Sequence, residues 1–308
     1  MDHVYDLIII GAGPAGITAS VYAARKRMDF LVITENIGGQ TAWSGDIENY
    51  TGFQFISGPE LTAKFEEHMK KYNVPLKERE TVTVVKKEGN IIVVATPKDT
   101  YKAKTVVVAS GKKSKELGVP GENEFKNKGL TYCATCDGPL FAGKDVVIAG
   151  GGNSALDAAL QLINIANKVY IVNISKKLFG DAIMRDKVVG NEKVTIFNES
   201  QITEVLGDKF VTGVKMTKEG KEEVLNVQGV FVEIGLVPNA KFIDDVNKND
   251  LGEIIVNCRN ETNAPGIYAA GDVTDVPAKQ IVIAAGDGAK ATIGAFKYIS
   301  SKSTKDWG

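Results

Sequence analysis

Short apolar runs bounded by glycine turns recur along this chain, with helix-like stretches between them. The runs at Leu7–Ile10 and Val106–Ala109 have the length of single strands and are apolar throughout, as buried parallel strands are. Apolar residues at helical spacing predict a helix over Gln280–Ile299, and Pro59–Tyr72 is predicted as another helix. The pattern therefore predicts an α/β protein. The segments predicted as strands of antiparallel meanders are Thr81–Val85, Ile91–Ala95, Gln201–Val205, Val211–Met216 and Val230–Ile234.

One β–α–β pattern occurs twice. Tyr5–Gly16 reads YDLIIIGAGPAG and Lys144–Ala155 reads KDVVIAGGGNSA, at an offset of 139 residues between positions 5 and 144. Without a gap, the same offset puts the strand Phe30–Ile33 on Val169–Val172. A chance match of glycines would not carry the downstream strand in register. We therefore expect two equal units of the kind that builds a doubly wound parallel sheet.

Glycine- and proline-rich segments at Ser110–Gly121 and near Gly235–Ala240 are the expected boundaries of the second unit. The chain is predicted to fold as two Rossmann-like, three-layer ββα nucleotide-binding domains, with the second inserted in the first. The first domain would comprise residues 1–114 and 242–308, and the inserted domain residues 115–241.

Gly11, Gly13 and Gly16 form GxGxxG directly after the first strand. In a dinucleotide site the first glycine permits the tight turn, the second lets the pyrophosphate approach, and the third lets helix and strand pack. The helix N-terminus attracts the phosphates, and Glu35 at the end of the next strand can accept hydrogen bonds from a ribose. A glycine turn in some other fold is the alternative interpretation.

A second nucleotide signal is GIYAAGD at Gly266–Asp272, a predicted strand that precedes the helix near Gln280. An acid at such a strand end, beside a glycine, can hold a ribityl hydroxyl while the following helix N-terminus faces a flavin ring. An ordinary strand and turn is the alternative.

Charge and hydropathy exclude two classes of partner. Lys and Arg total 37 against 38 Asp and Glu, so the chain lacks the basic bias that nucleic-acid or membrane-surface binding normally needs. No apolar run approaches the roughly 18 residues of a membrane span, and no signal-peptide pattern precedes the first strand. We therefore expect a cytoplasmic protein that binds neither nucleic acid nor membranes.

The chain has three cysteines, and Cys133 and Cys136 form a CxxC within YCATCDG. At the first turn of a helix this spacing lets the sulfurs reach disulfide distance, and the helix N-terminus favours the thiolate of the first cysteine. Asp137 is the candidate proton donor. We expect no metal site, because a closed zinc site needs four N or S ligands. Cys258, the remaining thiol, is expected to pack inertly on a strand.

These motifs together resemble low-molecular-weight thioredoxin reductase over essentially the whole chain, and YCATCDG is highly specific. The similar segments are GAGPAG, GGQ at Gly38–Gln40, ENYTGF at Glu48–Phe53, the turn at Ala109–Gly111, CATCDG, GGGNSA and AAGD. The C-terminal part, from GEIIVN through ETNAPGIYAAGDVTDVPAKQI, also resembles the flavoprotein subunit of alkyl hydroperoxide reductase.

The resemblance implies a role for each matching residue. Cys136 would exchange electrons with FAD, Cys133 would attack the disulfide of a partner protein, and Asp137 would shuttle the proton. It also implies a homodimer, and a swivel of the inserted domain that presents the nicotinamide and the dithiol to the flavin in turn. The expected FAD residues are Gly11, Gly13, Pro14, Ala15, Gly16, Glu35, Gly39, Gln40, Asn49, Ala109, Gly111, Gly271, Asp272, Lys279, Gln280 and Ile281, and the expected nicotinamide-nucleotide residues are Gly150, Gly152, Asn153, Ser154, Ala155, Asn173 and Ser175.

The second unit departs from the family pattern where NADPH would bind. In the family its second strand ends in His-Arg-Arg, with a further Arg four residues later, and the arginines hold the 2′-phosphate. Here those positions are Asn173, Ile174, Ser175 and Phe179. The repeat places Glu35 on Ile174, so the carboxylate that favours an NADH ribose is absent as well.

Three electron donors stay open. NADH would use Asn173 or Ser175 for its ribose, and NADPH would use Ser175, Lys176 and Lys177 for its phosphate. Without a nicotinamide, another donor such as ferredoxin would reduce the flavin. The retained GGGNSA turn favours a nucleotide, and we rank NADH before NADPH, although the same turn can also serve only to pack helix on strand.

The sequence thus predicts an FAD-dependent thioredoxin-disulfide reductase that acts on thioredoxin or a glutaredoxin-like protein. A second hypothesis is an electron donor to a peroxide-reducing peroxiredoxin partner. A third, of a different class, is a flavin redox sensor in which the cysteine pair is a switch. Asp137 beside the pair favours turnover over sensing.

Overall fold

The computed structural model describes residues 3–44, 46–218, 220–303 and 307. The chain divides into two compact units: unit 1 is Met1–Lys113 with Val237–Gly308, and unit 2 is Ser114–Leu236. Unit 2 is therefore an insertion in unit 1, and the α/β fold class predicted from the sequence is confirmed. Where the chain passes from one unit to the other, β9 (Lys112–Ser114) pairs with β18 (Leu236–Pro238).

Unit 1 is built on one sheet with the strand order β5-β2-β1-β8-β7-β6, in which β19 also pairs with β8. Strands β5, β2, β1, β8 and β19 pair in parallel, whereas β6 and β7 form an antiparallel hairpin on β8. The strands are β1 (Val4–Ala12), β2 (Phe30–Ile37), β5 (Leu76–Glu78), β6 (Val84–Glu88), β7 (Ile91–Ala95), β8 (Thr100–Val108) and β19 (Ile267–Ala269).

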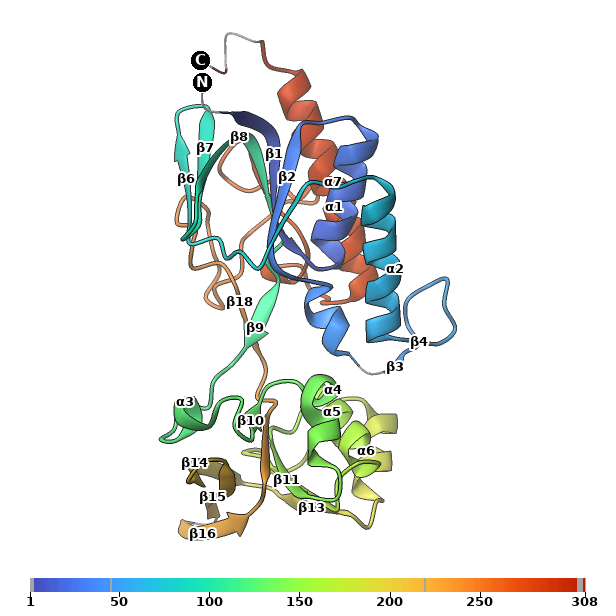
Figure 1. The fold of residues 1–308 in the computed structure, drawn as a ribbon, viewed down its shortest axis with the longest axis vertical. Helices are drawn as coiled ribbons and strands as arrows, with labels where there is room; N and C mark the ends of the chain where they lie inside the picture. Colours follow the sequence, from blue (N-terminus) through green and yellow to red (C-terminus); the bar gives the residue numbers. More distant parts are fainter. Residues whose placement is uncertain (1–2, 45, 219, 304–306, 308) are drawn as a thin grey trace. The chain divides into compact units, whose positions relative to one another are not determined.

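Alternate residues of β1 point into two separate cores. Leu7 and Ile9 pack among residues of the helices, whereas Ile8 and Ile10 pack with residues of the hairpin and the C-terminal segment. Figure 1 shows the helices α1 (Pro14–Arg25), α2 (Gly58–Lys71) and α7 (Ile281–Ser300) together on one side of the sheet. Burial on both faces explains why this strand is apolar throughout.

Helix α7 packs directly on α1 because small residues line the contact. A Cβ added at Gly288 would lie 2.0 Å from the carbonyl oxygen of Ala15, so only glycine permits this approach. Gly271 follows β19 and lies against both helices, since an added Cβ there would be 3.1 Å from the Cβ of Ala15 and 3.3 Å from that of Ala284. The contact thus joins the carboxyl end of β19 to the start of α1.

Unit 2 repeats this arrangement. Its parallel sheet has the order β10-β17-β11-β12-β13, and Val146 pairs with Val169 just as Leu7 pairs with Phe30, both shifted by 139 residues. Helices cover one face of the sheet and an antiparallel meander covers the other. The elements are β10 (Leu130–Thr131), β11 (Asp145–Ala149), α5 (Asn153–Ile163), β12 (Lys168–Val172), α6 (Ala182–Val189), β13 (Val194–Phe197), β14 (Ser200–Gly207), β15 (Val211–Lys218), β16 (Lys221–Asn226) and β17 (Gly229–Val232).

Two predicted strands need correction. The prediction that Val230–Ile234 belongs to a meander is wrong, because β17 pairs in parallel with β10 and β11 and is buried along its length. The third meander strand is β16, whose mostly exposed polar residues give no apolar signal. The strand predicted at Thr81–Val85 begins only at Val84, and the Thr81 hydroxyl instead donates to Glu35.

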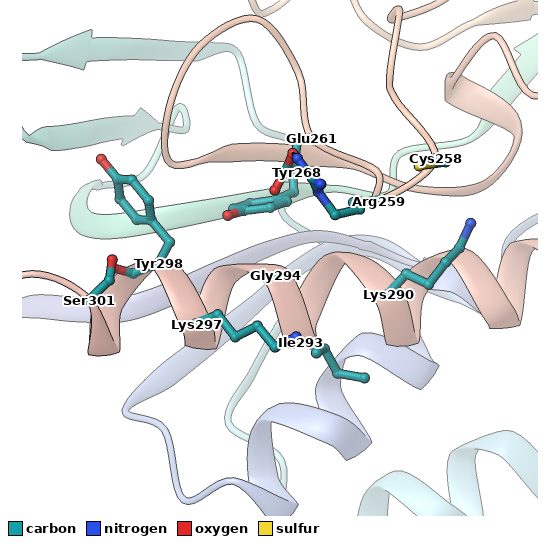
Figure 2. Close-up of a pocket in the computed structure, with 10 residues that line it drawn as sticks. All are labelled: Cys258, Arg259, Glu261, Tyr268, Lys290, Ile293, Gly294, Lys297, Tyr298 and Ser301. Carbon is teal, nitrogen blue, oxygen red and sulfur yellow. The ribbon is translucent and has the colours of Figure 1, made fainter.

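The two predicted helices are confirmed to within one residue at each end. Helix α2 begins where it does because Ser57 and Glu60 form a capping box. The prediction for Cys258 is wrong: it lies exposed in a turn, not on a strand, and it lines a pocket beside α7 (Figure 2). Within the part of the chain that the structure describes, no helix has both the length and the apolar character to cross a membrane.

Candidate active site

The first glycine turn, between β1 and α1, contains two glycines that the protein itself requires. Gly11 has a φ of +100°, and an added Cβ would lie 2.4 Å from the carbonyl oxygen of Ala109. At Gly16 an added Cβ would lie 1.8 Å from the carbonyl oxygen of Gly11. These contacts let α1 begin directly on the end of β1 and leave no room for a side chain.

Gly13 is different, because neither backbone strain nor packing within the described protein explains why this residue is a glycine. Its φ is −76°, which any residue adopts, and the nearest atom to an added Cβ is the Gly38 oxygen at 4.0 Å. Gly13 is also the N-cap of α1, and no side chain caps that helix, whereas α2 has its capping box. Open space beside unpaired N–H groups is what a pyrophosphate needs, so the residues here fit FAD.

The structure brings several predicted FAD residues together from distant parts of the chain. A Cβ added at Gly39, in the short helix η1 (Gly39–Trp43), would lie 3.3 Å from the Cα of Gly13. Asn49 Nδ2 donates to Gln280 Oε1 at 3.0 Å. Gly271 lies against Ala15, as described above. The residues after β2 and β19 therefore contact the first glycine turn, and the segment around Asn49 contacts the start of α7.

The start of α7 is a second open helix terminus. Gln280 is its N-cap, Ile281 is its first residue, and no side chain caps it. Asp272 precedes it in the short helix η3 (Gly271–Val273), where burial raises the pKa of its carboxyl group against the opposing effect of Lys279 and Lys112. An acid acceptor near unpaired N–H groups fits the ribityl chain and ring of a flavin.

A buried carboxylate holds two lysines beside this terminus. Glu253 Oε1 lies 3.0 Å from the Nζ of Lys112 and 3.0 Å from the Nζ of Lys279. Burial alone would raise its pKa, but hydrogen bonds from Asn249, Lys112 and Lys279 outweigh burial and lower the pKa to about 2. The backbone of Lys112 also accepts a hydrogen bond from Gln40 Nε2 at 3.2 Å. Lys279 and Gln40, both predicted FAD residues, are thus linked through Lys112 and Glu253.

The remaining predicted FAD residues lie at the ends of elements. Pro14 is the first residue of α1, where its fixed φ and missing N–H cause no loss. Ala109 follows β8, and Gly111 has a φ of +61°. The Glu35 carboxylate, on β2, is exposed and accepts the hydroxyl hydrogen bond of Thr81 at 2.8 Å. Glu35 contacts none of the other predicted FAD residues through a hydrogen bond within the described chain.

The predicted redox pair forms a disulfide at the start of α4 (Ala134–Asp137). Cys133 is the N-cap, and its Sγ accepts a hydrogen bond from the backbone N–H of Cys136 at 3.1 Å. After reduction, such a contact stabilises negative charge on the Cys133 sulfur. Cys136 is exposed, and Cys133 is half-buried.

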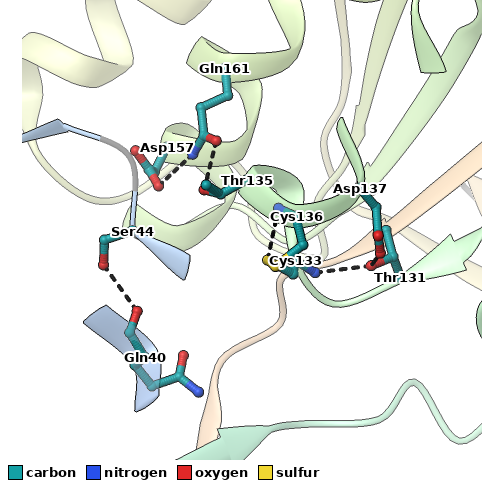
Figure 3. Close-up of a disulfide and its surroundings, with 9 residues drawn as sticks. All are labelled: Gln40, Ser44, Thr131, Cys133, Thr135, Cys136, Asp137, Asp157 and Gln161. Carbon is teal, nitrogen blue, oxygen red and sulfur yellow. Dashed lines mark hydrogen bonds between the residues drawn. A yellow bond between two sulfur atoms is a disulfide. The ribbon is translucent and has the colours of Figure 1, made fainter. Parts of the chain in front are cut away.

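Thr131 ties Asp137 to this pair (Figure 3). The Thr131 hydroxyl donates to Asp137 Oδ2, and the Thr131 hydroxyl oxygen also accepts a hydrogen bond from the backbone N–H of Cys133 at 3.1 Å. The backbone N–H of Asp137 donates to the Cys133 carbonyl at 3.2 Å. The Thr131 hydroxyl therefore links the Asp137 carboxylate to the backbone of Cys133.

A chain of hydrogen bonds links the redox turn, Cys133–Asp137, to helix α5 (Figure 3). Thr135 Oγ1 donates to Gln161 Oε1 at 2.8 Å, and Gln161 Nε2 donates to Asp157 Oδ2 at 2.9 Å. Burial, and then the charge of Asp157, raises the pKa of Glu233 to about 8. Glu233 is therefore mostly protonated at neutral pH, which lowers the negative charge near Asp157.

The second glycine turn, between β11 and α5, is filled by the protein's own side chains. A Cβ added at Gly151 would lie 2.4 Å from Asn173 Oδ1, and a Cβ added at Gly152 would lie 3.0 Å from the Phe179 ring. The backbone N–H of Phe179 also donates to the Gly151 carbonyl at 2.8 Å. Gly152, the equivalent of Gly13 in the repeat, is therefore explained by packing against Phe179.

Asn173, a predicted ribose ligand, uses its amide within its own loop. The residue is 1% exposed, its Oδ1 accepts from the Ser175 N–H at 3.2 Å, and its Nδ2 donates to the Ser175 carbonyl and to Asn198 Oδ1 at 3.1 Å each. The repeat equates Asn173 with Thr34, whose hydroxyl accepts from the Ala12 N–H at 3.1 Å in the first turn. Both residues join the end of the second strand to local backbone.

The helix that follows this turn is still open to an anion. Gly152 is the N-cap of α5 and no side chain caps the helix, so its first N–H groups keep a partial positive charge. Asn153 Oδ1 accepts from the Asp181 N–H at 2.8 Å, and Ser154 is exposed. Ala155 is buried, with its Cβ 3.4 Å from a Cβ added at Gly150.

Two of the three positions expected to carry arginines hold exposed apolar side chains instead. Ile174 is 74% exposed and Phe179 is 55% exposed. Lys176 and Lys177 are exposed beside them, and Ser175 is half-buried. The loop can supply two ammonium groups to a phosphate, but no guanidinium at the expected positions.

A model of the pyridine nucleotide-disulphide oxidoreductase family matches residues 5–288. The chain therefore belongs to the pyridine nucleotide-disulphide oxidoreductase family. Members of this family bind FAD and work with a pyridine nucleotide. The two glycine turns and the redox turn described above are thus parts of an oxidoreductase.

Two curated relatives of this oxidoreductase share about two fifths of its residues. An "NADH dehydrogenase" of Bacillus subtilis is 39% identical over 298 residues, and one of the subunits of an alkyl hydroperoxide reductase of Pseudomonas aeruginosa is 41% identical over 303 residues. Each alignment covers 96% of this chain but 58% of the relative, so the chain spans less than two thirds of either relative's length.

Solved structures of thioredoxin reductases share the fold, and the predicted resemblance to that family is confirmed. The Lactococcus lactis enzyme has a TM-score of 0.90 at 35% identity, covering 97% of this chain and 100% of that one. The T. acidophilum enzyme has a TM-score of 0.88 at 39% identity, covering 98% and 100%. A ferredoxin-flavin thioredoxin reductase from Clostridium acetobutylicum has a TM-score of 0.55 at 33% identity, covering 97% and 99%.

The predictions from the sequence do not include several residues that position the functional groups of this oxidoreductase. Thr131 lies two residues before the CxxC, and its hydroxyl is a local signal that could have been read. Glu253 lies in the similar segment GEIIVN, to which the sequence assigns no role, and Gln161 lies outside every motif. Only the fold brings these two residues to Lys279 and Thr135. Among the described residues no cluster of three or more His, Cys, Asp or Glu could hold a metal ion.

We predict that Glu233→Gln removes a pH-dependent loss of stability. The folded-state pKa of about 8 exceeds the ordinary value of 4.5, so the folded protein binds this proton more tightly than the unfolded chain. The wild type should therefore lose stability as the pH rises from 4.5 to about 8, and the glutamine variant should not. By thermal melting, the variant should match the wild type near ~pH 4 and melt several degrees higher near ~pH 9.

The matched control for this prediction is Glu192→Gln, which removes an exposed carboxylate from the same unit. It should show no pH-dependent difference from the wild type. If Glu233→Gln shifts the melting temperature equally at both pH values, the carboxyl group is not protonated in the folded protein.

Proposed function

We propose that this oxidoreductase is an FAD-dependent thioredoxin-disulfide reductase. The observation that carries the proposal is the redox turn, in which a Cys133–Cys136 disulfide lies at a helix start and Asp137 is fixed beside it by Thr131. Bound FAD would supply a two-electron carrier between an electron donor and this disulfide. The solved thioredoxin reductases with the same fold support the assignment.

The residues that would hold FAD are those around the first glycine turn and the start of α7. Unpaired N–H groups at the start of α1 would bind its pyrophosphate in the space above Gly13. Asp272 would accept a hydrogen bond from a ribityl hydroxyl. The ion pairs of Glu253 with Lys112 and Lys279 would hold Lys279 in place beside the flavin.

The reduced cysteines would reduce a partner disulfide in two exchanges. The Cys133 thiolate attacks one partner sulfur, the partner S–S bond breaks, and a mixed disulfide forms as one partner thiolate leaves. Cys136 then attacks the Cys133 sulfur, which restores the intramolecular disulfide and releases the second partner sulfur. Two electrons pass to the partner, and the Cys136 N–H stabilises the charge on Cys133 before the first attack.

Asp137 would manage the proton in these exchanges. Each leaving thiolate needs a proton, and each attacking thiol must lose one. Thr131 positions the carboxylate by donating to it while binding the Cys133 backbone. A flavin redox sensor would not need an acid held in this way, so the contact favours turnover.

The partner would be thioredoxin or a glutaredoxin-like protein, with the reductase acting as a homodimer as the resemblance implies. The helix η2 (Gly138–Phe141) follows the redox turn directly and leaves Leu140 67% exposed. An exposed apolar side chain four residues after Cys136 offers contact to a docking protein. A peroxiredoxin system is the second candidate, which the similarity to a component of alkyl hydroperoxide reductase favours.

For the electron donor we propose NADH. The uncapped start of α5 would bind a pyrophosphate, and the absence of arginines removes the reason to prefer a 2′-phosphate. A relative bearing the name NADH dehydrogenase supports this choice. NADPH would depend on Ser175, Lys176 and Lys177.

A donor other than a nicotinamide is the alternative that one specific observation favours. Phe179 occupies the space over Gly152, whereas the equivalent space over Gly13 is open in the first turn. A dinucleotide would have to displace the Phe179 ring, which a protein donor such as ferredoxin would not. The similarity to a ferredoxin-flavin thioredoxin reductase favours the same alternative.

We predict that Cys136→Ser abolishes thioredoxin reduction without affecting FAD binding. The variant lacks the sulfur that resolves the mixed disulfide, while the FAD residues are unchanged. The flavin absorbance should stay at the wild-type level and turnover should fall by about 10³-fold or more. Cys258→Ser is the control and should turn over normally; unchanged turnover in Cys136→Ser would remove that residue from the mechanism.

We predict that anaerobic addition of NADH bleaches the flavin at least about tenfold faster than NADPH or reduced ferredoxin at equal concentration. The reason is the missing guanidinium clamp for a 2′-phosphate. Phe179→Ala should then improve the reaction with NADH by opening the turn. Efficient bleaching by reduced ferredoxin alone, unaltered in Phe179→Ala, would establish the alternative donor.

A further inference from the structure

Unit 1 contains a pocket that none of the predicted FAD residues lines. It lies between α7 and the turn that carries Cys258, and it has a volume of about 490 Å³. Figure 2 shows Cys258 and Lys290 toward one end of the pocket and Tyr298 and Ser301 toward the other. This volume is within the range of small-molecule binding sites.

The side chain of a largely buried tyrosine, Tyr268, lines this pocket. Tyr268 is 4% exposed, and its ring packs so closely on α7 that a Cβ added at Gly294 would lie 2.7 Å from it. No hydrogen bond within the described residues involves the Tyr268 hydroxyl. Burial, and then the charges of Glu261 and Tyr298, raises its pKa to about 12, so the group remains an O–H donor at neutral pH. The hydroxyl group is therefore available to donate a hydrogen bond to a ligand in the pocket.

The charge of the pocket favours an anionic ligand. Its lining includes three cationic side chains, Arg259, Lys290 and Lys297, and one acid, Glu261. Glu261 Oε2 binds Arg259 at 2.8 Å, and Asp287, outside the lining, binds Lys290 at 2.9 Å. Lys297 forms no ion pair among the described residues, so the pocket keeps an uncompensated positive charge.

We propose that this pocket binds an anionic low-molecular-weight disulfide and that Cys258 forms a mixed disulfide with it. Cys258 is the free thiol of the chain and is exposed where it lines the pocket. The Tyr268 hydroxyl donates a hydrogen bond to an anionic group of the ligand, and Lys297 attracts that group. The site is separate from the proposed reductase activity, because neither the redox turn nor the FAD residues contribute to it.

The exchange balances without another oxidant. The Cys258 thiolate attacks one sulfur of the bound disulfide, R–S–S–R, and that S–S bond breaks as Cys258–S–S–R forms. The released R–S⁻ takes up a proton from water. One disulfide is consumed and one is formed, so no electrons are gained or lost overall.

The test uses the oxidised holoenzyme, in which Cys133 and Cys136 are already joined. Glutathione disulfide serves as the anionic probe and cystamine as the cationic one, and the mass of the intact protein reports each adduct. The rate with glutathione disulfide should saturate with concentration, because the probe binds before it reacts, whereas the rate with cystamine should stay proportional to concentration. Cys258→Ser should form no adduct with either probe.

Two variants separate a built site from an ordinary exposed thiol. Lys297→Gln should slow glutathione disulfide about threefold and accelerate cystamine about threefold at low ionic strength, with both effects fading in high salt. Tyr268→Phe should raise the half-saturating concentration of glutathione disulfide about threefold and leave cystamine unchanged. Lys71→Gln is the matched control, because Lys71 is an exposed lysine on α2 outside the pocket.

Flavin absorbance and thioredoxin turnover should remain at wild-type levels in all these variants, which keeps this test independent of the reductase assignment. The proposal is overturned if the wild-type rate with glutathione disulfide does not saturate. It is equally overturned if Lys297→Gln changes both probes in the same direction or behaves like Lys71→Gln.

Discussion

Backbone-to-backbone approach at the carboxyl ends of the parallel strands is the constraint on which both units depend. In unit 1 the Gly11 carbonyl lies where a Cβ of Gly16 would be, so α1 can begin directly on β1. Gly288 lets α7 approach α1 in the same way, and this brings Gly271 against Ala15. The result is two uncapped helix starts in one unit and an open space above Gly13, which are the conditions for holding an anionic dinucleotide.

The repeat reuses this geometry in unit 2 but fills it differently. The strand register is the same in both units, yet Phe179 lies on Gly152 and the Asn173 amide lies on Gly151. Thus the same backbone gives an open turn in unit 1 and a covered turn in unit 2. Because Phe179 covers the second turn, this turn favours no single electron donor by its shape. The first turn and the cysteine pair, in contrast, fit FAD and disulfide exchange.

Much of this fold could be predicted from the sequence, because its signals are local. The two glycine turns, the in-register downstream strands and the helices α2 and α7 all follow from periodicity and turn chemistry. The strand β16 could not, because it is a mostly exposed edge strand with more polar than apolar residues. The sequence pattern places β17 in the wrong sheet, because an apolar run does not reveal which strands it pairs with. The Cys258 turn was missed for a related reason: a lone cysteine in a polar segment carries no signal of its exposure.

The candidate site likewise contains residues that the sequence identifies and residues that only the fold identifies. Cys133, Cys136 and the glycines are motif residues, but Thr131, Glu253 and the Asn173 amide network act through contacts that only tertiary structure creates. Phe179 was recognised as a departure from the family pattern, yet its contact with Gly152 could not be inferred from spacing. Motifs therefore identify which groups react, and the fold decides how they are held.

The affinity of Gly13→Ala for FAD tests most directly whether the open space at the first turn belongs to a cofactor. A methyl group at this position meets no protein atom closer than 4.0 Å, so the apoprotein should melt at the wild-type temperature. The same methyl group would meet a pyrophosphate, and the dissociation constant of FAD should rise by about 100-fold or more. An unchanged dissociation constant would contradict the assignment of this turn as the flavin site.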